Sequence, residues 1–256
     1  MAIYGHSDLA VAVDGLFQEW ALVRDDRLLE LSDTLDWAEG SALMVNYLTT
    51  YLALTKTAKV RSGQIVLVSG ATGGVGHAGM QTAKALGARP VGRVSSPQKA
   101  RRATETGAWA VIDSASQKLD EAIAHLTDGH GVDIARDPVG GPRLGELTRS
   151  VRPGGTVMSL GFTGGTQAPV DVLDLFAGRL VTGYGVHGDS DEEIAKGLRP
   201  SAVWPPTGSR GPSLTAGSPS TTSRAATSAW PRGKPWAPSS SNSEPLAEGA
   251  PEGTPT

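Results

Sequence analysis

The chain has 256 residues, a formal net charge of −3 and no cysteine. This length allows one or two domains, and the charge balance gives no indication of a nucleic-acid partner. The absence of cysteine excludes disulfides and thiolate metal sites, and no apolar run is long enough to predict a membrane span. The first residues also lack the pattern of a secretory signal, so we expect a cytoplasmic protein. Because cysteine is absent, we also expect no metal site.

The charges are distributed unevenly along the chain. Residues 40–104 contain nine lysines and arginines and no acidic residue, whereas the segments on either side are rich in acids. A long acid-free segment in a mildly acidic protein indicates an anionic partner. The alternative is a chance gap in a segment rich in glycine and alanine.

The first 60 residues differ in pattern from those that follow. Residues 15–31 resemble two short strands around a turn at Asp25-Asp26, and residues 32–54 then read as a helical stretch that leads into the next region. Short apolar runs follow at 65–70, 89–94, 109–113, 131–137, 156–162 and 180–186, separated by segments with helical patterns. Strands that alternate with helices of about ten residues predict an α/β fold of the Rossmann type, a doubly wound parallel sheet with helices on both faces.

Residues 200–256 have a different composition, with eleven prolines and eleven serines. Such a segment has too few apolar side chains to offset the entropy of ordering it, so it is predicted to be a disordered tail. A proline-rich ligand for peptide-binding domains is the alternative.

The glycine cluster in VLVSGATGGVG, residues 66–76, follows the first of the buried strands. Dinucleotide-binding turns need glycine for a tight turn, for close approach to the pyrophosphate and for contact between helix and strand. Gly73 and Gly76 match the second and third glycines of that motif, and Ala71 replaces the first. The strand before the cluster and the helix after it favour dinucleotide binding over a structural turn.

The residues after the second strand indicate which dinucleotide is bound. An acidic residue here would bond the ribose 2′-hydroxyl of NAD and repel a 2′-phosphate. The chain has Ser95, Ser96 and Lys99 instead, followed by Arg101 and Arg102. Hydroxyls and cations suit a phosphate dianion, so the predicted cofactor is NADPH, although such a charge run can also be a solvated helix face.

These motifs together resemble the zinc-independent quinone oxidoreductase branch of the medium-chain dehydrogenase/reductase superfamily. The resemblance lies in NYLTTYLAL (46–54), VLVSGATGGVG (66–76), AKALGARPVG (83–92), VSSPQK (94–99), DPVGG (137–141) and GGTVMSLGF (154–162). It implies an NADPH-dependent oxidoreductase that passes a hydride directly to a quinone or an α,β-unsaturated carbonyl. It names no catalytic acid or base, and it implies a possible homodimer through the edge strand at 180–186.

The resemblance also assigns site residues by position. Asn46 and Thr49 would lie near the nicotinamide. Gly73, Gly74 and Val75 would bind the pyrophosphate, and Ser95, Ser96 and Lys99 would bind the 2′-phosphate. The walls of the cofactor cleft would include Val139, Gly140, Gly161 and Phe162. The alternatives are that Asn46 and Thr49 cap a helix or face solvent and that Phe162 belongs to the core. Tyr47 and Tyr51 are expected in the core.

Two positions depart from the family pattern. Arg136 stands where an apolar or aromatic residue usually ends the strand, and this cation must reach a partner, solvent or cofactor phosphate. Ser114 stands where relatives often have a tyrosine beside the adenosine phosphate.

The resemblance implies three parts: a remnant of a GroES-like substrate domain at 1–40, a Rossmann NADPH-binding domain at 41–199 and the tail at 200–256. The resemblance stops near residue 199, and a shifted reading frame would explain the tail. With so short a substrate domain, a catalytically inactive NADPH-binding fragment is the alternative to an active reductase.

Overall fold

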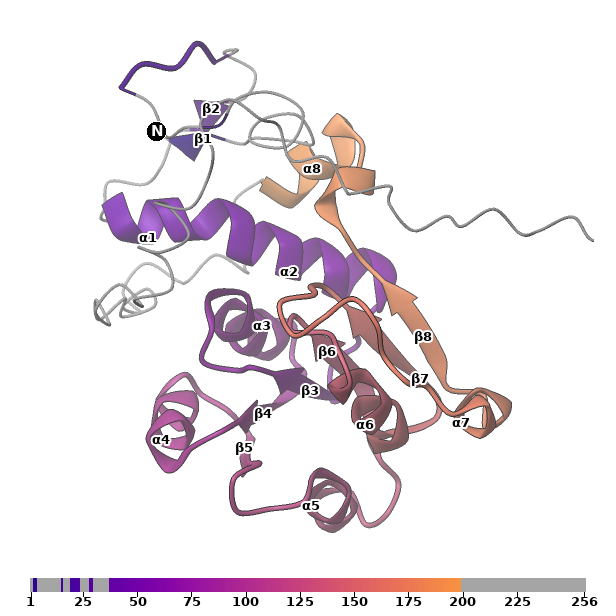
Figure 1. The fold of residues 1–256 in the computed structure, drawn as a ribbon. Helices are drawn as coiled ribbons and strands as arrows, with labels where there is room; N and C mark the ends of the chain where they lie inside the picture. The colour runs from indigo at the N-terminus through magenta and orange to yellow at the C-terminus, as the bar shows by residue number, and fades with distance from the viewer. Residues whose placement is uncertain (1, 4–14, 16–18, 24–27, 30–36, 199–256) are drawn as a thin grey trace, which may run out of the picture.

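The computed structural model describes residues 2–3, 15, 19–23, 28–29 and 37–198, and its centre is a six-stranded parallel sheet (Figure 1). The strand order is β5-β4-β3-β6-β7-β8, and every neighbouring pair is parallel. The strands are β3 (Ile65–Ser69), β4 (Arg89–Val94), β5 (Ala110–Asp113), β6 (Val132–Asp137), β7 (Val151–Ser159) and β8 (Leu180–Gly183). The chain therefore runs outward from β3 to one edge and then returns to β6, so that the strand order reverses between these two central strands.

Helices cover both faces of this sheet. One face is covered by α3 (Gly74–Ala85) and α4 (Pro97–Glu105), and the other by α5 (Leu119–Leu126) and α6 (Arg143–Ser150). All five residues of β3 are buried, because this strand lies between two apolar layers. The Rossmann-type fold predicted from the sequence is confirmed.

A long helix precedes the sheet and packs across α3. Its consecutive segments are α1 (Trp37–Ala42), η2 (Leu43–Leu48), α2 (Thr49–Leu52) and η3 (Ala53–Thr57), where η2 and η3 are π-helical. Leu43 and Tyr47 pack on Ala78 of α3, and the Tyr47 hydroxyl donates to the side chain of Gln81. Tyr47 is thus a core residue, as expected. No helix in the described part of the chain is long and apolar enough to cross a membrane.

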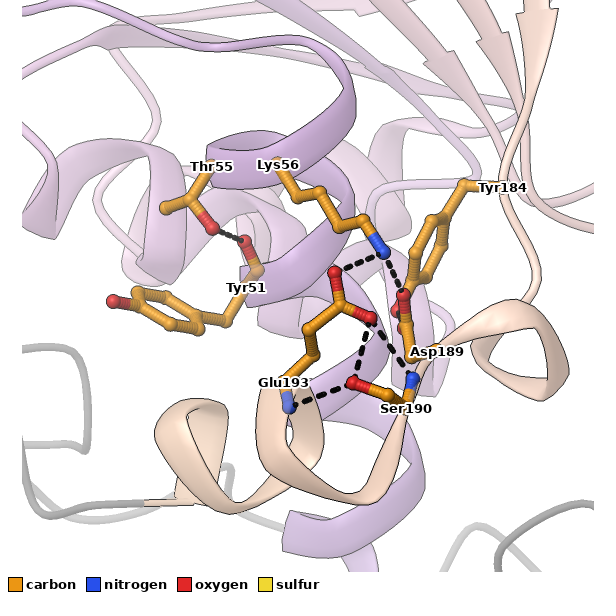
Figure 2. A network of polar contacts seen from close by, with 7 residues as sticks. All are labelled: Tyr51, Thr55, Lys56, Tyr184, Asp189, Ser190 and Glu193. Atoms are coloured by element: carbon orange, nitrogen blue, oxygen red, sulfur yellow. Dashed lines mark hydrogen bonds and ion pairs between the residues drawn. The ribbon is translucent and has the colours of Figure 1, made fainter.

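A polar network fastens α8 (Asp191–Leu198) to the end of this long helix (Figure 2). Lys56 Nζ lies 2.6 Å from Asp189 Oδ1 and 2.7 Å from Glu193 Oε1, and the Tyr184 hydroxyl donates to Asp189. Hydrogen bonds from Lys56 and from Ser190 lower the pKa of Glu193 to about 2. Ile194 of α8 also packs on Met44, Leu48 and Leu52, so both polar and apolar contacts hold α8 against the long helix.

Two predictions about strands are wrong. The fifth strand was expected at 156–162, but β7 begins at Val151 and ends at Ser159. Val132 pairs with Val151 and Ile134 with Thr156, so the residues between Val151 and Thr156 form a bulge in the strand. Their sequence has the pattern of a turn. Two short strands around a turn were expected at 15–31. Leu28–Leu29 form the strand β2, but residues 19–23, which precede the expected turn, form no strand, and β2 pairs antiparallel with β1 (Ala2–Ile3) instead.

Some expectations concern residues that the structure does not describe. The expected turn at Asp25-Asp26, most of the expected remnant at 1–40 and the whole segment 200–256 lie outside the described residues. Two helices that the sequence patterns did not indicate, α7 (Val172–Phe176) and α8, follow β7 and β8.

Candidate functional site

A cleft of about 560 Å³ opens at the carboxyl ends of the central strands. It lies where the strand order reverses between β3 and β6, which is where open parallel sheets bind ligands. It is lined by the last residues of β3 and β4 and by residues that follow β3, β4, β5, β6 and β7. They are Ser69, Gly70, Thr72, Gly73, Gly74, Val75, Gly76, Arg93, Val94, Ser95, Lys99, Arg102, Ser114, Pro138, Val139, Arg143 and Thr163. The glycine turn and the candidate phosphate-binding residues therefore share one cavity.

The glycine turn is a tight connection between β3 and α3. Gly70 adopts a positive φ of 62°, and its carbonyl accepts a hydrogen bond of 2.9 Å from the Gly73 amide. A Cβ at Gly76 would lie 2.0 Å from that same carbonyl oxygen, so this position requires glycine. The turn thus brings the start of α3 directly against the end of β3.

The start of α3 presents free backbone amides to the cleft. Gly73 is the N-cap, and the amides of the first turn have no partner inside the helix. Gly74 and Val75, in that first turn, line the cleft. A helix N-terminus of this kind attracts anions through its amides and its dipole. Asn46 lies against Gly74, where a Cβ would come within 2.8 Å of its Nδ2.

The wall formed by α4 carries hydroxyl and amine groups close together. Ser96 is the N-cap of α4, and its Oγ accepts from the Lys99 amide at 3.3 Å. Lys99 Nζ donates to Ser95 Oγ at 3.1 Å, and both residues are exposed to the cleft. Ser96 therefore orients the helix, whereas Ser95 and Lys99 remain able to contact a ligand.

The opposite wall is built from the loops that follow β6 and β7. The buried Asp137 carboxylate accepts from the amides of Val139 and Gly140, both at 3.0 Å, which shapes the loop after β6. The Gly164 amide donates to the Val139 carbonyl at 2.7 Å and joins the two loops. Thr163 lines the cleft, while the side chain of Phe162 is 66% exposed, so Phe162 is not a core residue.

The charged side chains that line the cleft are all cationic. Four cationic side chains line it, from Arg93, Lys99, Arg102 and Arg143, and no carboxylate does so among the described residues. Nearby, burial and the charge of Arg102 hold the pKa of His77 below its ordinary value. A cleft with this lining favours an anionic ligand of several phosphates.

Arg136 lies behind the glycine turn and not in the cleft. Its side chain is fully buried, and burial lowers its pKa to about 9. Nη1 donates to the Val75 carbonyl at 2.9 Å and Nη2 to Thr50 Oγ1 at 3.0 Å. Arg136 thus contacts the backbone of the first turn of α3, is closed off from solvent and does not line the cleft.

The predicted site residues divide into two groups. Those that line the cleft are Gly73, Gly74, Val75, Ser95, Lys99 and Val139. Those that do not are Asn46, Thr49, Ser96, Gly140, Gly161 and Phe162. Their contacts with a cofactor remain predictions. Arg93, Arg143 and Thr163 also line the cleft but were not predicted as site residues. Each lies at or after the carboxyl end of a strand, so that position could have indicated them.

Comparisons with known proteins agree with this geometry. A family model described as a zinc-binding dehydrogenase matches residues 74–200. The chain is 35% identical to a quinone oxidoreductase of Pseudomonas aeruginosa over 158 residues, which cover 62% of this chain and 49% of the relative. It is 30% identical to a 2-haloacrylate reductase of a Burkholderia species, over 62% of this chain and 49% of the relative.

A solved structure of Escherichia coli quinone oxidoreductase, complexed with NADPH, superimposes with a TM-score of 0.62 at 30% identity. The match covers 67% of this chain and 54% of that one, so the chain spans about half the length of the relatives it matches. Among the described residues, no group of three potential metal ligands is close enough to hold an ion. Sequence, family model and fold together place the chain in the quinone oxidoreductase branch of the medium-chain dehydrogenase/reductase superfamily.

Proposed function

We propose that the cleft binds NADPH. The proposal rests on one observation. The same cavity contains the glycine turn at the start of α3 and four cationic side chains, and no carboxylate of the described residues lines it. NADPH has a pyrophosphate and an additional 2′-phosphate, which suits these two features. The NADPH complex of the Escherichia coli relative supports the same cofactor.

The residues of the cleft suit the parts of this cofactor. The amides of Gly74 and Val75 would bind the pyrophosphate, since they lie in the first turn of α3. Ser95 and Lys99 would bind the 2′-phosphate through a hydroxyl and an ammonium group that already contact each other. The nicotinamide end would extend toward Val139 and Thr163, on the opposite wall.

We further propose that this domain serves an oxidoreductase that reduces quinones or α,β-unsaturated carbonyls. The names of the relatives, quinone oxidoreductase and 2-haloacrylate reductase, support both substrate classes. When bound, NADPH supplies the hydride, and the residues described above hold it at the carboxyl edge of the sheet. No described side chain is assigned as a catalytic acid or base.

Two measurements on the full chain test these proposals separately. NADPH fluorescence should change on titration with the protein, and NADPH absorbance should fall when a simple benzoquinone or methyl vinyl ketone is added. Binding without consumption of NADPH by either substrate would contradict the proposed activity and leave the cofactor proposal standing. No binding at millimolar NADPH would contradict both.

Lys99→Glu should weaken NADPH binding about 30-fold and NADH binding less than about threefold, because it replaces an attraction to the 2′-phosphate by a repulsion. Fluorescence titration of each dinucleotide measures the two affinities. Arg101→Glu is the matched control, since Arg101 is exposed on the same helix but does not line the cleft. It should leave both affinities nearly unchanged. Equal losses for NADPH and NADH in Lys99→Glu would show that Lys99 does not contact the 2′-phosphate.

We also propose that β8 joins two copies of the chain edge to edge. Within the described part of the chain β8 pairs only with β7, and its residues Leu180 and Val181 are 59% and 38% exposed. An edge strand with free backbone groups and exposed apolar side chains can extend a sheet across a dimer. Sedimentation should give the mass of a dimer, and the double variant Leu180→Lys with Val181→Lys should sediment as a monomer. Val45→Lys, at an exposed position on η2, should not change the mass. A monomeric unaltered chain would contradict the proposal.

A further inference from the structure

Arg93 lines the cleft and has donor groups without a partner. It is a residue of β4, and its side chain is 8% exposed. Nη2 forms an ion pair of 2.6 Å with Glu146 of α6. Nε and Nη1 are also buried, and neither has a hydrogen-bond partner. Buried donors without partners are costly and rare in folded proteins, so these two nitrogens indicate a ligand.

The position of Arg93 defines which part of a ligand it can meet. Its ion pair with Glu146 directs its guanidinium toward α6, whereas Ser95 and Lys99 belong to the wall formed by α4. Arg93 and Ser114 also line an adjoining cavity of about 350 Å³, which is bounded by the start of α5 and by α6. Arg93 therefore lies between the cleft and this second cavity, across from the predicted phosphate site.

We propose that Arg93 binds the adenine base of the dinucleotide. The inference rests on the proposed function. Adenine and the 2′-phosphate are attached to neighbouring carbons of one ribose, so a phosphate at Ser95 and Lys99 would bring the base to the same end of the cleft. A ring nitrogen of adenine can accept a hydrogen bond from Nε or from Nη1, or the planar guanidinium can stack on the ring. Because NADPH and NADH carry the same base, Arg93 contributes equally to the binding of both.

Arg93→Lys tests this assignment while it retains a cation beside Glu146. Titrations on the full chain follow dinucleotide fluorescence, with NADPH, NADH and reduced nicotinamide mononucleotide as the probes. We expect NADPH and NADH to bind about tenfold more weakly, each by the same factor, because the lysine ammonium has no donors at the positions of Nε and Nη1 and no planar group that could stack on adenine. The mononucleotide has no adenine, so its affinity should not change. Arg93→Met should weaken both dinucleotides at least as much, and Arg149→Lys, which lines only the second cavity, should affect none of the three.

Three results would overturn the assignment. A loss confined to NADPH would mean that Arg93 binds the 2′-phosphate. Unchanged affinities for both dinucleotides would mean that Arg93 only supports the fold, and an equal loss for the mononucleotide would mean that the substitution disturbs the whole site. An unaltered chain that binds neither dinucleotide would instead overturn the proposed function, and the adenine assignment with it.

Discussion

Replacement of Gly79 by alanine should lower the free energy of unfolding by about 3 kcal/mol, although it adds only one methyl group. A Cβ at Gly79 would lie 1.6 Å from Nη1 of Arg136 and 2.6 Å from its Cζ. The guanidinium cannot move aside, because it is fully buried and donates to the Val75 carbonyl and to Thr50. Denaturant unfolding, followed by circular dichroism, measures the change.

A double-mutant cycle shows whether Arg136 is the cause of this loss. Methionine at position 136 has no guanidinium, so Gly79→Ala in an Arg136→Met background should cost less than about 1 kcal/mol. Arg136→Met by itself should be no less stable than the unaltered chain, since it removes a buried charge whose described partners are a backbone carbonyl and a hydroxyl. Thr50 Oγ1 already donates to the Val75 carbonyl at 3.4 Å, so this carbonyl keeps a donor once the guanidinium is gone. Equal losses for Gly79→Ala in both backgrounds would refute the coupling.

Gly76→Ala and Gly73→Ala should separate folding from cofactor binding, although both change the same turn. A Cβ at Gly76 would meet only backbone, 2.0 Å from the oxygen and 2.8 Å from the carbon of the Gly70 carbonyl. Gly76→Ala should therefore destabilise the domain by at least about 3 kcal/mol. At Gly73 the nearest contact would be 3.4 Å, an ordinary van der Waals distance, so Gly73→Ala should cost no more than about 1 kcal/mol.

The effect of Gly73→Ala should appear in binding instead. Its methyl group would stand where the pyrophosphate approaches the backbone, and NADPH affinity should fall by about tenfold or more. Thermal unfolding without cofactor and NADPH titration together distinguish the two variants. If Gly73→Ala bound NADPH as well as the unaltered chain, the pyrophosphate would not lie against this turn. If Gly76→Ala unfolded at the same denaturant concentration as the unaltered chain, the close approach of α3 to β3 would not be a constraint.

Elements controlled by nearby residues were predicted well from the sequence. The strand at 89–94 agrees with β4 in both bounds, and α4 begins at Pro97, directly after its N-cap Ser96, within a segment that had a helical pattern. Caps, turns and continuous apolar runs act over a few residues, which is why they can be recognised without the fold. The bulge in β7 was missed because the pairing of Val151 with Val132 decides it, and the local sequence reads as a turn.

The sequence by itself determined the Rossmann-type fold, the glycine turn and the cluster of Ser95 with Lys99, because each depends on a short segment. Only the tertiary structure decided the roles of the two buried arginines. Arg93 meets Glu146, 53 positions away, and Arg136 meets Thr50, 86 positions away. An arginine side chain is long and its guanidinium has five N–H donors, so its partners come from whichever helices the fold packs beside its strand. For this reason neither the space left by Gly79 for Arg136 nor the free donors of Arg93 can be seen in a linear pattern.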